Sequence, residues 1–213
     1  METNYKDVKE SLLAFGKRHL ACYLEYKRLY AAESVEAVMA VVKDNFSWYC
    51  QFADFADVLL AHREQFAEHK IWINTSVEIK EGVGYLLTTE GEFNAGSWDT
   101  STINAVSRDT STINARSRDT STINARSWDT STINAESQDT STINAGSWDT
   151  STINAVSQDT STINAESWDT STMIIFTSAI ECQVNDRSIA RYIKDNRVVF
   201  ADDSMKFEKQ KQG

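Results

Sequence analysis

Serine, threonine and aspartate recur at fixed intervals through the middle of the chain, and these are the residue types that could do chemistry there. From Asp99 onward the chain repeats the ten-residue unit Asp-Thr-Ser-Thr-Ile-Asn-Ala-x-Ser-x, and the last partial copy ends at Met173. A serine nucleophile needs a neighbouring general base, but no histidine occurs within the repeats. We therefore expect no catalysis in the repeat region.

The histidines all precede the repeats, at His19, His62 and His69. His62 and His69 are seven residues apart and could share one face of a helix, with Glu64 and Glu68 nearby. No cysteine or aspartate completes a metal-binding set at a known spacing. We expect structural or surface roles for the histidines, no metal, no cofactor and no enzymatic activity, although an enzyme in the N-terminal segment stays open.

The aspartate column, from Asp99 to Asp169 at every tenth residue, has two interpretations. Carboxylates stacked ~4.8 Å apart repel one another, and a bound cation would relieve that repulsion. Alternatively, each aspartate lies at a corner of the chain and caps backbone amides. Calcium-binding solenoids use glycine-rich turns, which this repeat lacks, so we favour corner capping.

The composition is that of an acidic protein, with a net charge of −10 and an isoelectric point near 4.8. This balance argues against direct nucleic-acid binding, which needs clustered lysine and arginine, but it is compatible with a nucleic-acid mimic. The cysteines, Cys22, Cys50 and Cys182, lack a partner motif, which fits a reducing compartment. With no visible signal peptide or membrane span, we expect a cytoplasmic protein without a membrane partner.

The repeat favours β-strand, because Thr, Ser, Asn and Asp compete with helical backbone bonding and ten is an even number. One parity is small or apolar and nearly invariant, so we expect Ser101, Ile103, Ala105 and Ser107 to point inward, whereas Asp109, which shares this parity, is the exception and lies at a corner. The other parity holds every variable residue, so we expect it to point outward: Thr100, Thr102, Asn104, Val106 and Arg108. Because one large apolar residue in ten gives a thin core, only stacking of repeats into a β-solenoid buries it.

The number of residues in one coil stays open at this point. A ten-residue coil gives a flattened rod with two faces, whereas a twenty-residue coil gives a squarer tube in which two isoleucines face each other. We prefer ten, because one face then carries Thr-x-Thr-x-Asn in every coil and the opposite face carries the variable residues.

The variable residues are the most informative part of the repeat. Outward tryptophan is unusual and indicates an interface. The candidate interface comprises Trp98, Arg108, Arg118, Trp128, Gln138, Trp148, Gln158 and Trp168, and Arg108, Arg116, Arg118 and Arg126 form a local basic patch. The block Gly96-Ser97-Trp98 recurs as Gly146-Ser147-Trp148, which indicates a second, longer duplication.

The flanks predict a helical N-terminal cap and a small β-rich C-terminal cap around the solenoid. We expect one long helix over 5–31, a second over 35–42 capped by Ser34, a third over 52–68, and strands over 72–80 and 83–88. After the repeats we expect strands over 181–184, 188–192 and 197–200, a turn at Asp195-Asn196 and a frayed tail. The expected regions are 1–88 for the N-terminal cap, 89–178 for the solenoid and 179–213 for the C-terminal cap.

The pattern Ser101-Thr102-Ile103-Asn104-Ala105, preceded by Gly84-Tyr85-Leu86-Leu87, resembles bacterial proteins of uncharacterised function with runs of an Ala-Thr-Val-x-Ala-x-Asp-Ser unit. Ala190-Arg191-Tyr192 and Met205-Lys206-Phe207-Glu208-Lys209 are also similar to that group. The resemblance covers most of the chain. It implies a β-solenoid and no particular activity.

The Thr-x-Thr pairs resemble the flat face of ice-binding β-solenoids. The matching residues are Thr100, Thr102, Thr110, Thr112, Thr120, Thr122, Thr130, Thr132, Thr140, Thr142, Thr150, Thr152, Thr160, Thr162, Thr170 and Thr172. If both members of a pair lie on one strand, they are ~6.6 Å apart, with ~4.8 Å between coils, and such an array could order water. The insect members carry cysteine staples that this repeat lacks, and many members are secreted.

Three functions follow from these patterns. The first is a non-enzymatic scaffold or interaction protein that self-associates as a homo-oligomer, or binds another protein, through the variable tryptophan-bearing face. The second is binding of ice or another ordered surface by the threonine face. The third is nucleic-acid mimicry, although the pentapeptide-repeat mimics carry a central Leu or Phe in every pentad, whereas the second pentad of this repeat, as in Val106-Ser107-Arg108-Asp109-Thr110, lacks one.

Overall fold

The computed structural model describes residues 5–176, 181–185, 187–200 and 207–209, which fall into two compact units, 1–73 and 74–213. The first unit is helical apart from one short strand at its end. Its elements are α1 (Tyr5–Arg18), α2 (Tyr23–Ala31), α3 (Val35–Asp44), α4 (Phe46–Tyr49), α5 (Phe55–Ala61), α6 (Arg63–Glu68) and β1 (Ile71–Ile73).

The single helix predicted over 5–31 is wrong, because the chain breaks between α1 and α2. Leu20 adopts a left-handed conformation with φ of 53°, and the amide of Ala21 donates to the carbonyl of Gly16 at 2.8 Å, which terminates α1. No glycine or proline marks this stop in the sequence. Leu20 itself is 89% exposed, so it contributes nothing to the core.

The remaining helix predictions succeed at α3 and fail further on. The Ser34 side chain accepts a hydrogen bond from the amide of Ala37 at 3.2 Å, which confirms the predicted N-cap. The helix predicted over 52–68 is interrupted at His62, between α5 and α6. His62 and His69 therefore flank α6 at its two ends, and the prediction that they share one helix face is wrong.

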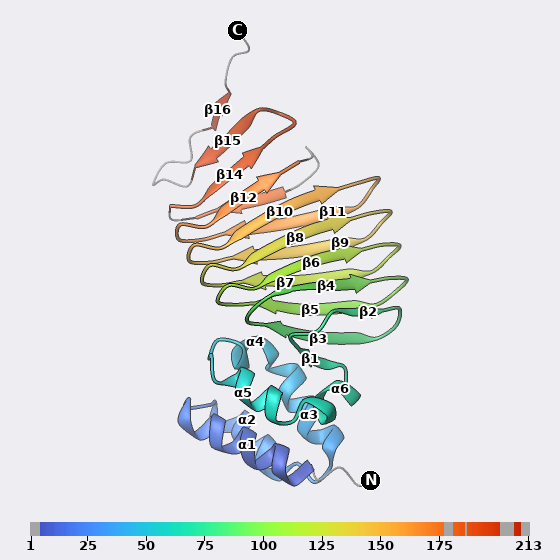
Figure 1. Cartoon of the computed structure of the whole chain (residues 1–213), viewed down its shortest axis with the longest axis vertical. Coiled ribbons are helices and arrows are strands. Elements are labelled where there is room, and N and C mark those ends of the chain that lie inside the picture. Colours follow the sequence, from blue (N-terminus) through green and yellow to red (C-terminus); the bar gives the residue numbers. More distant parts are fainter. Residues whose placement is uncertain (1–4, 177–180, 186, 201–206, 210–213) are drawn as a thin grey trace. The chain divides into compact units, whose positions relative to one another are not determined.

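The second unit is a β-solenoid, and its strands form two sheets. Sheet A contains β3 (Val83–Thr88), β5 (Thr102–Ser107), β7 (Thr122–Ser127), β9 (Thr142–Ser147), β11 (Thr162–Ser167) and β13 (Glu181–Val184). Sheet B contains β2 (Val77–Ile79), β4 (Glu92–Ser97), β6 (Thr112–Ser117), β8 (Thr132–Ser137), β10 (Thr152–Ser157), β12 (Thr172–Ile175), β14 (Ile189–Tyr192), β15 (Arg197–Phe200) and β16 (Phe207–Lys209). Figure 1 shows these strands stacked as successive rungs in two layers.

One coil takes twenty residues, so the preference for a ten-residue coil is wrong. Thr122 pairs in parallel with Thr142 within sheet A, and Thr132 pairs with Thr152 within sheet B. Each ten-residue repeat is therefore half a coil: six residues of strand and a reversal that carries the chain to the other sheet. Consecutive repeats contribute to sheets A and B alternately.

The core lies between the two sheets, as the alternation in the sequence predicts. Ile103, Ile123, Ile143 and Ile163 point inward from sheet A, and Ile113, Ile133 and Ile153 point inward from sheet B; all are fully buried. The alanine two residues after each isoleucine is also buried. Burying an isoleucine side chain contributes roughly 1.5–3 kcal/mol, so the two stacked columns together hold the sheets against each other.

Buried serine pairs close the coil at every reversal. Ser127 and Ser131 have their hydroxyl oxygens 2.7 Å apart. The Ser131 hydroxyl also lies within hydrogen-bonding distance of two backbone carbonyls, 3.0 Å from that of Ser107 in the preceding coil and 2.7 Å from that of Trp128 in its own turn. Both hydroxyls are therefore satisfied in the interior, where an unpaired polar group would be costly.

The C-terminal strands continue from the repeats. The strands predicted over 181–184 and 197–200 match β13 and β15, and the strand predicted over 188–192 matches β14. The turn predicted at Asp195-Asn196 is present, with Asn196 in the left-handed region at φ 47°. In the tail, β16 pairs antiparallel with β15, and residues 210–213 lie outside the described residues.

The twenty-residue coil predicts which engineered cysteines can form a disulfide. Thr122 and Thr142 are register partners on neighbouring strands, and a Cα separation of ~4.8 Å suits a disulfide. Thr122 and Thr132 lie on different sheets. We expect Thr122→Cys/Thr142→Cys to close an intramolecular disulfide on mild oxidation, measured by mass spectrometry in a Cys22→Ser, Cys182→Ser background. A disulfide in Thr122→Cys/Thr132→Cys, with none in Thr122→Cys/Thr142→Cys, would contradict the twenty-residue coil and support a ten-residue coil.

The serine pairs predict a local stability difference between adjacent residues. Ser131→Ala removes a buried hydroxyl and leaves buried groups without a partner, so we expect the free energy of unfolding to fall by about 1–3 kcal/mol. Thr130→Ala is the matched control, because its hydroxyl also bonds a backbone carbonyl, that of Asp109 at 2.7 Å, but is exposed. Urea unfolding followed by circular dichroism measures both; equal losses would contradict the role given to the buried pair.

Candidate interaction surface

Three indoles form a column along one edge of sheet A. Trp128, Trp148 and Trp168 each follow the last residue of a sheet A strand, and Arg108 holds the same position one coil earlier. Because the coil has twenty residues, these four side chains lie one above the next. All four are half-buried, so the column, which we call the tryptophan column, leaves part of each indole on the surface.

The Trp148 indole folds back over the outer face of the sheet. A Cβ atom added to Gly146 would lie 2.5 Å and 2.6 Å from two carbon atoms of the Trp148 ring, so the ring occupies the space above this glycine. The Trp128 and Trp148 ring centroids are 5.6 Å apart with an interplanar angle of 30°, an offset arrangement that aromatic pairs favour. The recurrence of Gly-Ser-Trp in the sequence indicates a duplication at Gly146 and Trp148, but it does not predict the contact between them.

Sheet B carries the other half of the predicted interface, so the prediction of one tryptophan-bearing face is wrong. Trp98, Arg118, Gln138 and Gln158 line its edge. The Arg118 guanidinium lies over the Trp98 ring at 5.1 Å, which is a cation–π contact. Trp98 also lies over a glycine, Gly96, as Trp148 does over Gly146. Sheet B therefore presents one indole and a polar edge, whereas sheet A presents three indoles.

The predicted basic patch is also divided. Arg116 and Arg118 belong to sheet B, where Arg116 pairs with Glu136 at 3.3 Å. Arg108 and Arg126 belong to sheet A, where Arg108 pairs with Asp129 at 3.5 Å. The four arginines thus lie on two faces and make no single basic surface.

The threonine pairs do not lie on one strand as predicted. Thr102 and its equivalents begin the strands, but Thr100 and its equivalents lie in the reversals. There the Thr120 hydroxyl donates to the carbonyl of Asp99 in the preceding coil at 2.8 Å, and Thr140, Thr150, Thr160 and Thr170 repeat this bond. Only one threonine column per sheet remains on the flat face, with no Thr-x-Thr row across a strand.

Asparagine ladders run beside those threonine columns. The side-chain amide of Asn124 donates to the side-chain carbonyl of Asn104 at 3.0 Å, and Asn134 donates to Asn114 at 2.8 Å. Equivalent bonds continue to Asn144, Asn154 and Asn164. These outward amides satisfy one another along the solenoid axis, so both sheets present a regular polar surface beside the variable columns.

The aspartates lie at the corners, as predicted. Asp99, Asp109 and every later aspartate of the column have positive φ, from 54° to 63°, a region that aspartate tolerates better than most residues. The Asp149 carboxylate accepts a hydrogen bond from the amide of Asp129 in the preceding coil at 3.3 Å. Within the part of the chain that the structure describes, no three His, Cys, Asp or Glu side chains gather closely enough to hold a metal ion.

Two histidines of the helical unit, His19 and His62, have a polar side-chain partner. His19 lies 2.8 Å from Asp54, which also accepts from Arg18 at 2.5 Å. Burial raises the pKa of Asp54, but the hydrogen bonds and charges of His19 and Arg18 outweigh burial and lower it overall. Ser11 lies 2.9 Å from His62, a nucleophile–base separation that sequence spacing did not predict. Among the described residues, His62 has no carboxylate partner that would orient it as in a catalytic triad.

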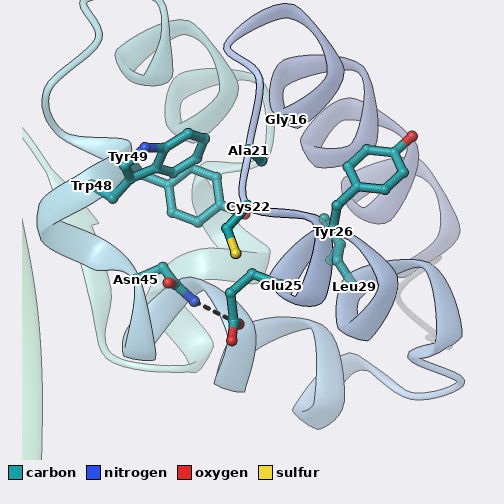
Figure 2. Close-up of a pocket in the computed structure, with 9 residues that line it drawn as sticks. All are labelled: Gly16, Ala21, Cys22, Glu25, Tyr26, Leu29, Asn45, Trp48 and Tyr49. Atoms are coloured by element: carbon teal, nitrogen blue, oxygen red, sulfur yellow. Dashed lines mark hydrogen bonds between the residues drawn. The ribbon is translucent and has the colours of Figure 1, made fainter.

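A small cavity of about 140 Å³ lies between α1, α2 and the start of α4. Figure 2 shows Cys22, Glu25 and Tyr49 among the residues that line this cavity, with the Asn45 side-chain amide hydrogen-bonded to the Glu25 carboxylate at 2.9 Å. Burial, reinforced by Glu25, raises the pKa of Tyr49 to about 12, so its hydroxyl stays protonated at neutral pH. The described lining of the cavity includes one carboxylate, that of Glu25, and one thiol, that of Cys22.

No protein-family model matches this chain, and no curated protein or solved structure matches it either. In the described residues, no helix is both long enough and apolar enough to cross a membrane. The tryptophan column therefore stands as the candidate functional surface on its own geometry.

Proposed function

We propose that this protein is a non-enzymatic β-solenoid scaffold that associates with a second copy of itself through the tryptophan column of sheet A. The observation that carries the proposal is the alignment of Trp128, Trp148 and Trp168 at the ends of successive sheet A strands, each with part of its side chain at the surface. Tryptophan is among the residues most enriched where binding energy concentrates.

The rest of sheet A supports this function because its outer face is a regular polar surface beside the tryptophan column. Threonine and asparagine columns fill the outer face between Thr102 and Asn164, and the asparagines hydrogen-bond along the axis. A surface that combines aromatic side chains with hydrogen-bonded polar side chains beside them has the composition of a typical protein–protein contact. The residues that vary between repeats occupy only two outward columns, those of Val106 and Arg108, next to the reversal. Differences in these columns could give selectivity for one partner over another.

The absence of an enzymatic role is supported by the state of the solenoid hydroxyls. The buried serines are engaged with each other and with backbone carbonyls, as at Ser127 and Ser131. The reversal threonines donate to carbonyls of the preceding coil. Hydroxyls held in this way serve the fold, and the outer face of sheet A presents threonine, asparagine, indole and charged side chains, which are suited to recognition.

The size of the face predicts a modest affinity. Five strands of sheet A, β3 to β11, each of six residues, span roughly 500 Å² at ~4.8 Å between strands and ~3.3 Å per residue. A standard stable interface buries about 800 Å² on each partner. We therefore expect a dimer that dissociates on dilution and whose mass depends on concentration.

Two identical blocks on opposite sheets provide a matched pair of variants. Trp148→Ser removes an indole from the tryptophan column, and Trp98→Ser removes an indole from the same Gly-Ser-Trp sequence on sheet B. We expect Trp148→Ser, and more strongly Trp128→Ser/Trp148→Ser, to lower the mass measured by light scattering at high protein concentration. Trp98→Ser should leave that mass unchanged.

Two results would refute the proposed function. A parent protein that stays monomeric at every concentration has no self-association to explain. Equal loss of mass in Trp98→Ser and Trp148→Ser would assign the effect to general destabilisation. Circular dichroism of each variant confirms that the solenoid is folded before its mass is compared.

A further inference from the structure

We propose that the two copies pack face to face with their solenoid axes antiparallel, about a two-fold axis that runs along strand β9. This inference rests on the proposed self-association and adds the orientation and register of the partner. It comes from the residues that differ between otherwise identical repeats, because only those residues can tell one end of the face from the other.

The column immediately before the tryptophans is electrostatically self-complementary. Val106, Arg126, Gly146 and Glu166 follow one another on β5, β7, β9 and β11 as direct register partners. Arg126 and Glu166 are both exposed and lie one strand on either side of Gly146. A rotation of 180° about an axis along β9 reverses the order of the strands, so it places Arg126 of one copy opposite Glu166 of the other.

The same rotation brings the indoles together. Trp128 and Trp168 lie one coil on either side of Trp148. The rotation therefore places Trp128 of one copy opposite Trp168 of the other, and Trp148 opposite Trp148. Gly146 lies at the centre of this arrangement and has no side chain, and the Trp148 ring fills the space above it. At the end of β9, the contact between the two copies is therefore aromatic and uncharged, with one pair of Arg126 and Glu166 on each side along the solenoid.

The parallel alternative brings like charges together. If the two-fold axis instead ran parallel to the solenoid axis along the column of Val106, Arg126, Gly146 and Glu166, Arg126 would face Arg126 and Glu166 would face Glu166. Like-charge juxtaposition disfavours an interface, and each copy already carries a net charge of −10. The corner aspartates do not distinguish the arrangements, because their carboxylates turn toward amides of the neighbouring coil, as Asp169 does toward Asp149 at 3.3 Å.

An arrangement with this symmetry is closed. The same patch is used by both copies, so the contact is isologous and produces a dimer instead of a growing fibre. Closure matters for a solenoid, because unpaired strand edges can otherwise pair with further copies and form open-ended assemblies.

Charge reversal tests the register without removing any indole. In Arg126→Glu, the new glutamate faces the partner's Glu166, and in Glu166→Arg, the new arginine faces the partner's Arg126. Because each single variant brings like charges together, we expect each to raise the dimer Kd at least about tenfold. The double variant Arg126→Glu/Glu166→Arg restores opposite charges and should regain the parent Kd. Arg116→Glu on sheet B is the control and should leave the Kd unchanged. Sedimentation velocity over a concentration series measures each Kd.

An equimolar mixture of the two single variants supplies an independent arm. One copy then contributes two acidic residues and the other two basic residues, so the mixture should associate more tightly than either variant alone. A parent dimer whose Kd is unaffected by both single reversals would overturn the antiparallel register while leaving self-association intact. A monomeric parent would instead overturn the proposed function.

Discussion

The structure depends on how the chain reverses direction once in every ten residues. A strand of six residues must turn through a half circle in four, and the aspartate in the left-handed region makes that turn. The paired serines then fill the corner and hydrogen-bond to the backbone of the preceding coil. Because this corner is the same in every repeat, each repeat delivers the next strand to the opposite sheet, and the two isoleucine columns meet between them.

Much of this fold could be predicted from the sequence, but the winding could not be predicted from alternation alone. The even period correctly assigned Ile103 and Ala105 to the interior and Asn104 to the surface. Alternation is identical for ten-residue and twenty-residue coils, however, and it treated Thr100 as part of a strand. The useful signal was the single aspartate per repeat: a closed coil needs at least two corners, so one corner per repeat implies two repeats per coil. The break at Leu20 had no such signal.

The half-coil period also decides what a change in repeat number does to the surface. Removing one repeat moves every later strand to the other sheet, so Trp148 and Trp168 would leave the column of Trp128. Removing two repeats returns them to the same sheet one coil earlier. The fifty-residue spacing of Trp98 and Trp148 is an odd number of repeats, which explains why identical Gly-Ser-Trp blocks occupy opposite sheets. The candidate interface residues could thus be named from the sequence, whereas their division between the two sheets could be assigned only once the number of residues per coil was known.

The central claim, that one repeat is half a coil, is most directly tested by a distance along the solenoid. Spin labels on Glu92→Cys and Thr172→Cys lie on sheet B strands that are connected through the register partners Thr112, Thr132 and Thr152. At ~4.8 Å per strand, the twenty-residue coil predicts that the labelled backbone positions are roughly 19 Å apart, whereas a ten-residue coil predicts roughly 38 Å. Double electron–electron resonance, in a Cys22→Ser, Cys182→Ser background, should give the shorter distance. The longer distance would contradict the account.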